Sequence, residues 1–324
     1  MKSVGFRRER EGTWAELETL VQRVERGGIA DLSPADVSRL PVLYRATLSS
    51  LSVARAISLD ANLLAYLESL GARAYVAIYS AKSHPLEAAR DFWRRQFPRA
   101  VAAARAQVAL SAIVMALGVV TGAALTLQDP ARFYALVSEG VAEGRGPGST
   151  TEELRDVLYG KRDAADLLAA FAMFLFTHNA GIGMLCFASG FAAGVPTLLL
   201  LFGNGLILGA FSGLYAERGL GLEFWAWILP HGVTELLAVV LCGAAGLVLA
   251  EALLFPGRHT RLGNLALRGR EAGLVVIGAV LMFLAAGLVE GIFRQVVHAP
   301  AVRMSVAALT AVGWAAYFLR RPQP

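Results

Sequence analysis

The distribution of apolar residues divides the chain into two unlike parts. Before about residue 100, hydrophobic residues recur every three or four positions among charged ones, which is the spacing of one helix face. The clearest such run is Trp14, Leu17, Leu20, Val21 and Val24. Beyond that point, apolar runs of about 20 residues dominate, the length that a helix needs to cross a bilayer. The pattern predicts an all-α protein with a helical domain over residues 1–100 and a transmembrane helix bundle over residues 101–324.

Six of these runs are predicted to be membrane spans. They cover residues 102–127, 168–190, 195–215, 227–253, 273–293 and 304–319. The last is the shortest, so five spans and one surface helix are the alternative. Glycines four residues apart share one helix face and allow neighbouring backbones to approach closely. Such glycines are Gly118/Gly122, Gly190/Gly194, Gly205/Gly209/Gly213 and Gly287/Gly291.

Arginine placement predicts the orientation of the spans. Cytoplasmic loops of membrane proteins are enriched in Lys and Arg, and arginines gather before the first span, in the 256–272 loop and at the C-terminal end. The 128–167 loop is acidic instead. We therefore expect both termini in the cytoplasm and this loop outside. We also expect the loop to be partly disordered and then helical, with Ser149 or Thr150 as the helix cap.

Composition supports a membrane protein and argues against other classes. Hydrophobic residues make up 56% of the chain and charged residues only 17%, against about 25% charged residues in soluble domains. The net charge of +5 suits a membrane surface, and no nucleic-acid-binding module is visible. We therefore predict membrane lipids as partners and no nucleic acid. Cys186 and Cys242 both lie in apolar runs, which favours core residues over a disulfide.

Aromatic and basic residues alternate at about 85–100, directly before the first predicted span. This pattern predicts an amphipathic helix at the membrane interface, with the rings at headgroup level and the guanidinium groups beside the lipid phosphates. A plain linker helix is the alternative. The predicted membrane-interface residues are Phe92, Trp93, Arg94, Arg95, Phe97 and Arg99.

Few polar residues lie within the predicted spans, where an ionisable group is costly and usually faces the protein interior. Because successive spans run in opposite directions, these residues all fall between the membrane midplane and the outer surface. We therefore predict one intramembrane polar cluster, with either a structural or a functional role. Its predicted members are His178, Asn179, Asn204, His231, Glu235 and Glu290.

His231 and Glu235 are one helical turn apart and so share a helix face, with Pro230 expected near the helix start. A hydrogen-bonded pair that stabilises packing is the simplest interpretation. A proton or ion pathway, a metal site and catalysis are the alternatives. For a metal, His178 would be the third ligand, but nothing fixes a tetrahedral spacing. The HExxH pattern of metalloproteases is absent, since Gly232 follows the histidine. We predict no catalytic residue, metal or cofactor.

The stretch from about residue 174 to residue 293 carries three motifs in order, "FGNG", "PHGVTE" and a late "LVEG". Their characteristic residues are Asn204, Gly205, Pro230, His231, Gly232, Glu235 and Glu290. Together they resemble the stage II sporulation protein M family of bacterial integral membrane proteins. The resemblance implies a multi-pass, non-enzymatic protein of the bacterial cytoplasmic (inner) membrane, and it supplies no catalytic residues.

The founding members of that family act in engulfment during endospore formation, with partners that remodel peptidoglycan. The resemblance therefore favours a membrane scaffold whose partners are other membrane or envelope proteins, with a homo-oligomer as a further expectation. One alternative is a small-solute or ion transporter or channel that uses the polar cluster. A second alternative is an intramembrane hydrolase that uses His231 and Glu235.

Overall fold

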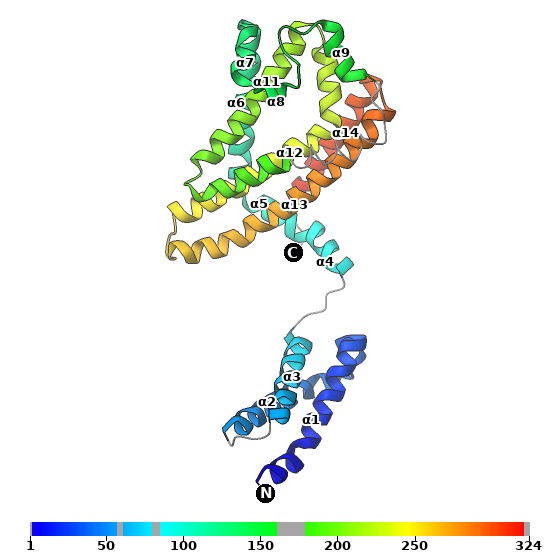
Figure 1. The fold of residues 1–324 in the computed structure, drawn as a ribbon, viewed down its shortest axis with the longest axis vertical. Helices are drawn as coiled ribbons and strands as arrows, with labels where there is room; N and C mark the ends of the chain where they lie inside the picture. The colour runs from blue at the N-terminus through cyan, green and yellow to red at the C-terminus, as the bar shows by residue number, and fades with distance from the viewer. Residues whose placement is uncertain (1, 57–60, 80–84, 161–178, 321–324) are drawn as a thin grey trace. The chain divides into compact units, whose positions relative to one another are not determined.

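The computed structural model describes residues 2–56, 61–79, 85–160 and 179–320, and the regular structure in these ranges is helical, as predicted. The chain divides into two compact units, Met1–Ala89 and Arg90–Pro324 (Figure 1). The division falls earlier than the predicted boundary at residue 100. The physical reason is that the segment directly after Ala89 packs with the helices of the second unit.

Three helices form the first unit. They are α1 (Lys2–Gly27), α2 (Pro34–Ala56) and α3 (Ala61–Tyr79), with the short 3-10 helix η1 (Ile29–Asp31) between α1 and α2. Gly28 ends α1 with a φ of 80°, a conformation that costs glycine little because it lacks a Cβ. Trp14 and Leu67 lie in the shared core, and Arg73 of α3 forms ion pairs with Glu18 and Glu25 of α1 at 3.4 and 2.9 Å. The unit therefore has a hydrophobic core of its own.

Five described helices of the second unit are long and apolar enough to cross a membrane. They are α6 (Arg105–Gln128), α11 (Val195–Glu217), α12 (Gly221–Leu254), α13 (Arg261–Val296) and α14 (Pro300–Leu319). They correspond to the first and the third to sixth predicted spans. The most buried of the five is α12, which contacts the other four.

The first part of the second predicted span lies outside the described residues. Its end is a shorter apolar helix, Asn179–Phe191, whose last turn is the 3-10 helix η4 (Ser189–Phe191). There, a methyl group on Gly190 would overlap the backbone of Gly246 in α12. This helix therefore packs closely against α12.

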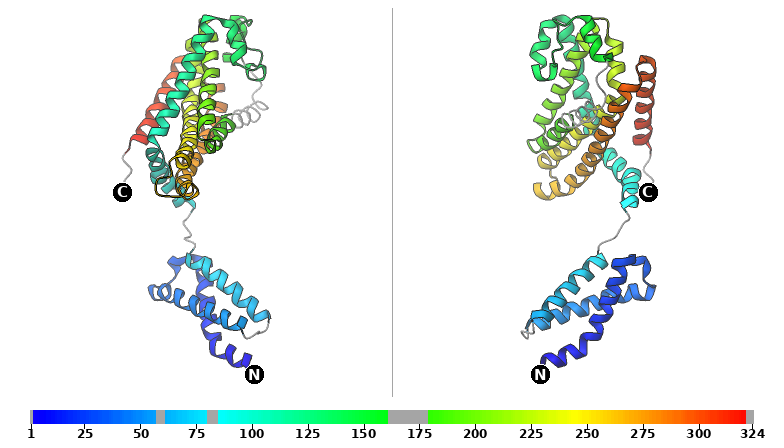
Figure 2. Two further views of the ribbon diagram at one scale, coloured as in Figure 1. Left: turned by 90° about the vertical axis from the view of Figure 1, so that its left-hand side faces the viewer. Right: turned by 45° about the vertical axis from the view of Figure 1, so that its right-hand side comes forward.

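Glycines bring α6 and α11 into backbone contact along their length (Figure 2). A methyl group on Gly205 would overlap the carbonyl oxygen of Met115, and one on Gly209 would overlap that of Val119. Lipid tails are as apolar as leucine, so helices in a bilayer associate through such close packing rather than through a hydrophobic driving force. The close approach predicted from the glycine spacing is confirmed for this helix pair.

The aromatic and basic segment before the first span is helical but changes its winding. It consists of α4 (Pro85–Asp91), a π-helical stretch η2 (Phe92–Gln96) and α5 (Phe97–Ala103). Phe97 is fully buried. Its ring contacts Tyr317 and Phe318 of α14 and fills the space beside Gly278 of α13. Phe97 is therefore a core residue of the second unit, not the lipid-facing ring that the sequence predicts.

The other predicted interface residues divide by type. Phe92 and Trp93 are half-buried and pack against Phe97, whereas Arg94, Arg95 and Arg99 are exposed. The aromatic side of this segment thus packs against protein and its basic side is open. Contact of the exposed guanidinium groups with lipid headgroups remains a prediction.

Short helices fold residues 129–160 into a cap over one end of the bundle. They are η3 (Pro130–Arg132), α7 (Phe133–Leu136), α8 (Glu139–Ala142) and α9 (Thr151–Tyr159). Thr150 caps α9 as predicted: its hydroxyl accepts from the Glu153 N–H, and the Glu153 carboxylate accepts from the Thr150 N–H. Phe133 and Leu154 are buried against Phe211 and its neighbours on α11, so residues 129–160 of the loop are packed. Residues 161–167 of the predicted loop lie outside the described residues, and the expected partial disorder stays a prediction.

The close contact at Gly205 predicts that an added methyl group destabilises the protein there but not at Gly203. Gly205→Ala should destabilise the chain by about 1–3 kcal/mol, because the added methyl group overlaps backbone that cannot move aside cheaply. Gly203→Ala on the same helix is the matched control, since no atom lies within 4 Å of its added methyl group. Thermal melting of both purified variants in detergent, followed by tryptophan fluorescence, checks this. Equal melting temperatures would contradict the close α6–α11 contact.

Candidate functional site

α12 presents His231 and Glu235 on one face, one helical turn apart. The helix begins at Gly221, ahead of the predicted start at residue 227, so Pro230 lies inside the helix and not in its first turn. A proline has no N–H, so the Ala226 carbonyl lacks its usual partner within the helix. The polar face of α12 therefore begins where the backbone hydrogen bonding of the helix is interrupted.

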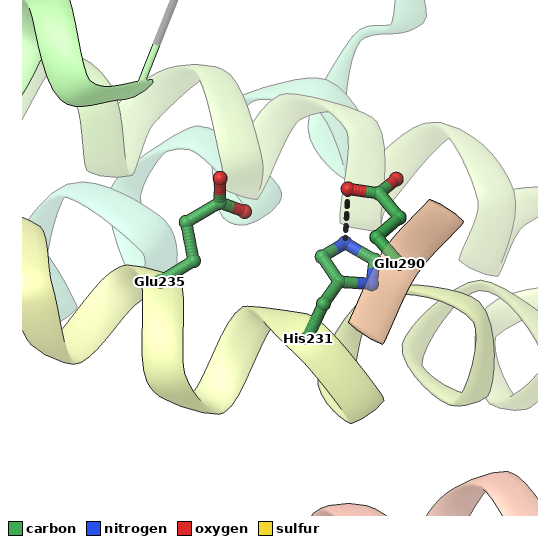
Figure 3. Close-up of side chains that lie close together, drawn as sticks. All are labelled: His231, Glu235 and Glu290. Carbon is green, nitrogen blue, oxygen red and sulfur yellow. Dashed lines mark ion pairs between the residues drawn. The ribbon is translucent and has the colours of Figure 1, made fainter. Parts of the chain in front are cut away.

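Glu290 approaches this face from α13 (Figure 3). His231 Nε2 lies 3.6 Å from Glu290 Oε2, and one ligand atom from each of His231, Glu235 and Glu290 lies within 4.8 Å of the other two. The three residues are only 7%, 7% and 3% exposed, respectively. The structure thus gathers three of the six predicted cluster residues in one buried place, which we call the polar triad.

Asn179 also belongs to this group. Its Nδ2 donates a hydrogen bond of 2.7 Å to Glu235 Oε1, which links the short apolar helix to α12. His178 lies outside the described residues. Asn204 of α11 is half-buried, and among the described residues it makes no hydrogen bond to the triad. The proposed membership of Asn204 therefore receives no support from the described contacts.

Arg303 is a residue of this site that the sequence analysis did not select. It is 2% exposed in the first turns of α14, and it lines a small cavity together with His231 and Glu290. The predicted span starts at residue 304 and leaves Arg303 outside it. Pro300 was the available signal, because proline favours the first turn of a helix and would have placed Arg303 within α14.

The surroundings of Arg303 hold it in position. Its Nε donates to the Val297 carbonyl at 2.7 Å, and its guanidinium carbon lies 5.7 Å from the ring centre of Tyr159 in the cap. Burial and the nearby Glu223 raise the pKa of Tyr159, so this ring stays neutral beside the arginine at physiological pH. The cap and the start of α14 therefore meet at the edge of the triad.

A second hydrogen bond ties α14 to α12 beside the triad. Trp314 Nε1 donates to Thr234 Oγ1 at 3.0 Å, and Thr234 is itself buried. Thr234 directly precedes Glu235, so this bond fixes the backbone from which the carboxylate projects. Side chains of α12, α13, α14 and the short apolar helix therefore meet at one place.

The cavity at the triad is small. It measures about 10 Å³, and a buried water needs roughly 10–15 Å³. Its lining residues are Trp227, Pro230, His231, Val289, Glu290, Phe293 and Arg303. This cavity, bounded by described residues beside His231 and Glu290, therefore admits about one water molecule.

The chemistry of the triad is dominated by charge. Glu235 and Glu290 bring two carboxylates into an apolar bundle, where an unpaired charge costs several kcal/mol. Arg303 supplies a permanent positive charge, and His231 can supply a second if it is protonated. Such a group can hold helices together, share a proton or bind a cation.

Removing the buried guanidinium of Arg303 should show how much the stability of the bundle depends on a positive charge near the carboxylates. We expect Arg303→Met to destabilise the chain by about 3–5 kcal/mol, because a buried carboxylate loses its compensating charge. Arg105→Met removes an exposed arginine and should change stability by less than about 0.5 kcal/mol. Adding Glu290→Gln to Arg303→Met should restore part of the loss. Additive effects of the two substitutions in thermal melting would show that these groups are not coupled.

Comparison with known protein families gives one match in each unit. The family model of stage II sporulation protein M matches residues 108–293, more than half of the chain and including the whole polar triad. A model of a domain of unknown function (DUF8413) matches residues 4–80, within the first unit. No curated protein and no solved structure gave a match. The chain therefore belongs to the stage II sporulation protein M family, as its motifs predict.

Proposed function

We propose that this multi-pass membrane protein is a scaffold of the bacterial inner membrane, which holds partners of a cell-envelope or peptidoglycan-remodelling complex. Membership of the family and five apolar helices support the membrane location. The observation that carries the proposal is the burial of the polar triad among packed helices. Polar side chains that contact one another in this way hold a bundle in one arrangement.

The first unit offers a surface for partners. Tyr75, Val76 and Tyr79 lie on α3 and are 55%, 55% and 63% exposed. Tyr75 and Val76 also line a shallow hollow together with Tyr44 and Leu48. Exposed apolar patches that contain tyrosine are typical of protein–protein contact sites. We call these five residues the tyrosine patch, and we assign it the recruitment of a partner protein.

The transporter hypothesis has less support. It requires the intramembrane polar residues to line a space that water can enter. The cavity beside His231 and Glu290 has room for about one water. The same small volume leaves little room for the substrate of an intramembrane hydrolase.

Labelling with a membrane-impermeant maleimide tests the orientation that the scaffold requires. Cys186 and Cys242 are buried, so an introduced cysteine should give the main signal. Ser138→Cys lies in the exposed part of the cap and Ser38→Cys in the first unit. We expect intact spheroplasts to label Ser138→Cys, and Ser38→Cys to label only after permeabilisation. The opposite pattern would place the first unit outside the cell.

Photocrosslinking in living cells tests recruitment by the tyrosine patch. A photoreactive amino acid at position 75 should give a discrete adduct with an envelope protein, identified by mass spectrometry. The control position is Arg26, an exposed residue at the end of α1 outside the patch. We expect Tyr79→Ala to reduce the adduct several-fold without changing the amount of protein in the membrane. Equal crosslinking from the two positions would argue against the patch as a docking surface.

A further inference from the structure

We propose that His231, Glu235 and Glu290 bind one divalent transition-metal ion, with Zn²⁺ as the best fit. This assignment goes beyond the scaffold function, which stands without it. The motif on α12 provides two ligands, and the sequence alone offered only His178 as a third. The structure instead brings Glu290 from α13 into the group.

The geometry is close to that of a metal site. Tetrahedral zinc with nitrogen and oxygen ligands at about 2.0–2.1 Å places the ligand atoms about 3.3 Å apart. The His231 Nε2–Glu290 Oε2 distance is already 3.6 Å, and the three ligand atoms lie within 4.8 Å of one another. Binding of the ion would therefore require these ligand atoms to approach one another by at most about 1.5 Å.

The donor set selects the kind of ion. An imidazole nitrogen with two carboxylate oxygens suits zinc, iron and manganese, whereas calcium and magnesium prefer oxygen ligands alone. Copper(I) prefers thiolates and thioethers. The ligand chemistry of the polar triad therefore points to a divalent first-row metal.

Charge gives an independent reason for a cation. Glu235 is 7% exposed, and its hydrogen-bond partner is the neutral amide of Asn179. A buried carboxylate needs a positive charge or a proton nearby. Arg303 lines the cavity beside Glu290, and among the described residues no ion pair joins a cationic side chain to Glu235. A metal ion between Glu235 and His231 would supply the charge that the amide cannot.

Two neighbouring features would complete the site. Asn179 donates to Oε1 of Glu235 and so orients the carboxylate while leaving Oε2 available, as hydrogen-bond partners of metal ligands commonly do. The cavity of about 10 Å³ beside His231 and Glu290 has room for about one water. That water would provide a fourth ligand.

The test uses the full-length protein, purified in detergent without chelator. Elemental analysis should find about one zinc per chain, as a single three-residue site requires. After removal of the metal with a strong chelator, Co²⁺ should restore binding and give the visible absorption bands of a four-coordinate site. Competition by Zn²⁺ should abolish these bands. Wild-type protein that holds no zinc and gives no bands with Co²⁺ would overturn the proposal, without reference to any variant.

Variants assign the ligands. His231→Ala and Glu290→Gln should each lower Co²⁺ affinity at least 100-fold, and Asn179→Ala by about 10–100-fold through loss of orientation. Glu251→Gln is the matched control, since this carboxylate is on the same helix but exposed, and it should bind like wild type. Each variant is compared only if it elutes as one species and melts cooperatively. Folded His231→Ala and Glu290→Gln variants that retain wild-type affinity would place the metal elsewhere and overturn the assignment.

The result is separable from the scaffold proposal. The crosslinked adduct at position 75 tests recruitment by the first unit, whereas metal binding tests the polar triad in the helix bundle. If the protein binds Co²⁺ but gives no adduct, the metal-site proposal stands and the recruitment proposal fails. If it gives the adduct but binds no Co²⁺, the recruitment proposal stands and the metal-site proposal fails.

Discussion

The cost of placing two carboxylates inside an apolar bundle is the constraint on which the arrangement of the second unit depends. A charge at that depth is tolerated only with compensation from groups that arrive with it. Here the neighbouring groups come from several helices: His231 of α12 pairs with Glu290 of α13, Asn179 of the short apolar helix donates to Glu235, and Arg303 of α14 lines the same cavity as Glu290. Each of these contacts specifies which helix faces must meet. The polar triad therefore fixes helix order as well as adding contacts.

A second kind of contact holds the other side of the bundle. Gly205 and Gly209 allow α11 to contact the backbone of α6 directly, and such contacts make no use of charge. α12 lies between the two kinds of contact, because it touches α6 and α11 as well as α13 and α14. Its high burial follows from that position. A substitution on α12 is therefore expected to affect both sides of the bundle.

Much of the helical layout could be predicted from the sequence, because span length and glycine spacing are local properties. The same holds for the cap of α9, where Thr150 and Glu153 lie three residues apart. For α12 and α13, alternating span directions predict that their polar residues lie at the same membrane depth. They do not predict that these residues touch. Which side chains then touch depends on how the helices rotate about their axes, and hydropathy carries little of that information.

The failures have the same origin. Phe97 has the pattern of an interface aromatic, and only the position of Gly278 on another helix shows that a ring fits there. Arg303 resembles a loop cation until the start of α14 is known. The two compact units divide at Ala89, because the segment after it packs with the second unit. Tertiary contacts between residues distant in sequence settled all three cases.

We infer that His231, Glu235 and Glu290 form one compact centre between α12 and α13, with a bound cation balancing its buried charge. The most direct measurement is a cryo-electron microscopy map of the full chain in a lipid nanodisc, at a resolution that shows side chains. We expect the three side chains to be turned toward one another around a single compact density, with packed helices on both membrane sides of it. Separated side chains, or a continuous water-filled path from the triad to either membrane face, would contradict it.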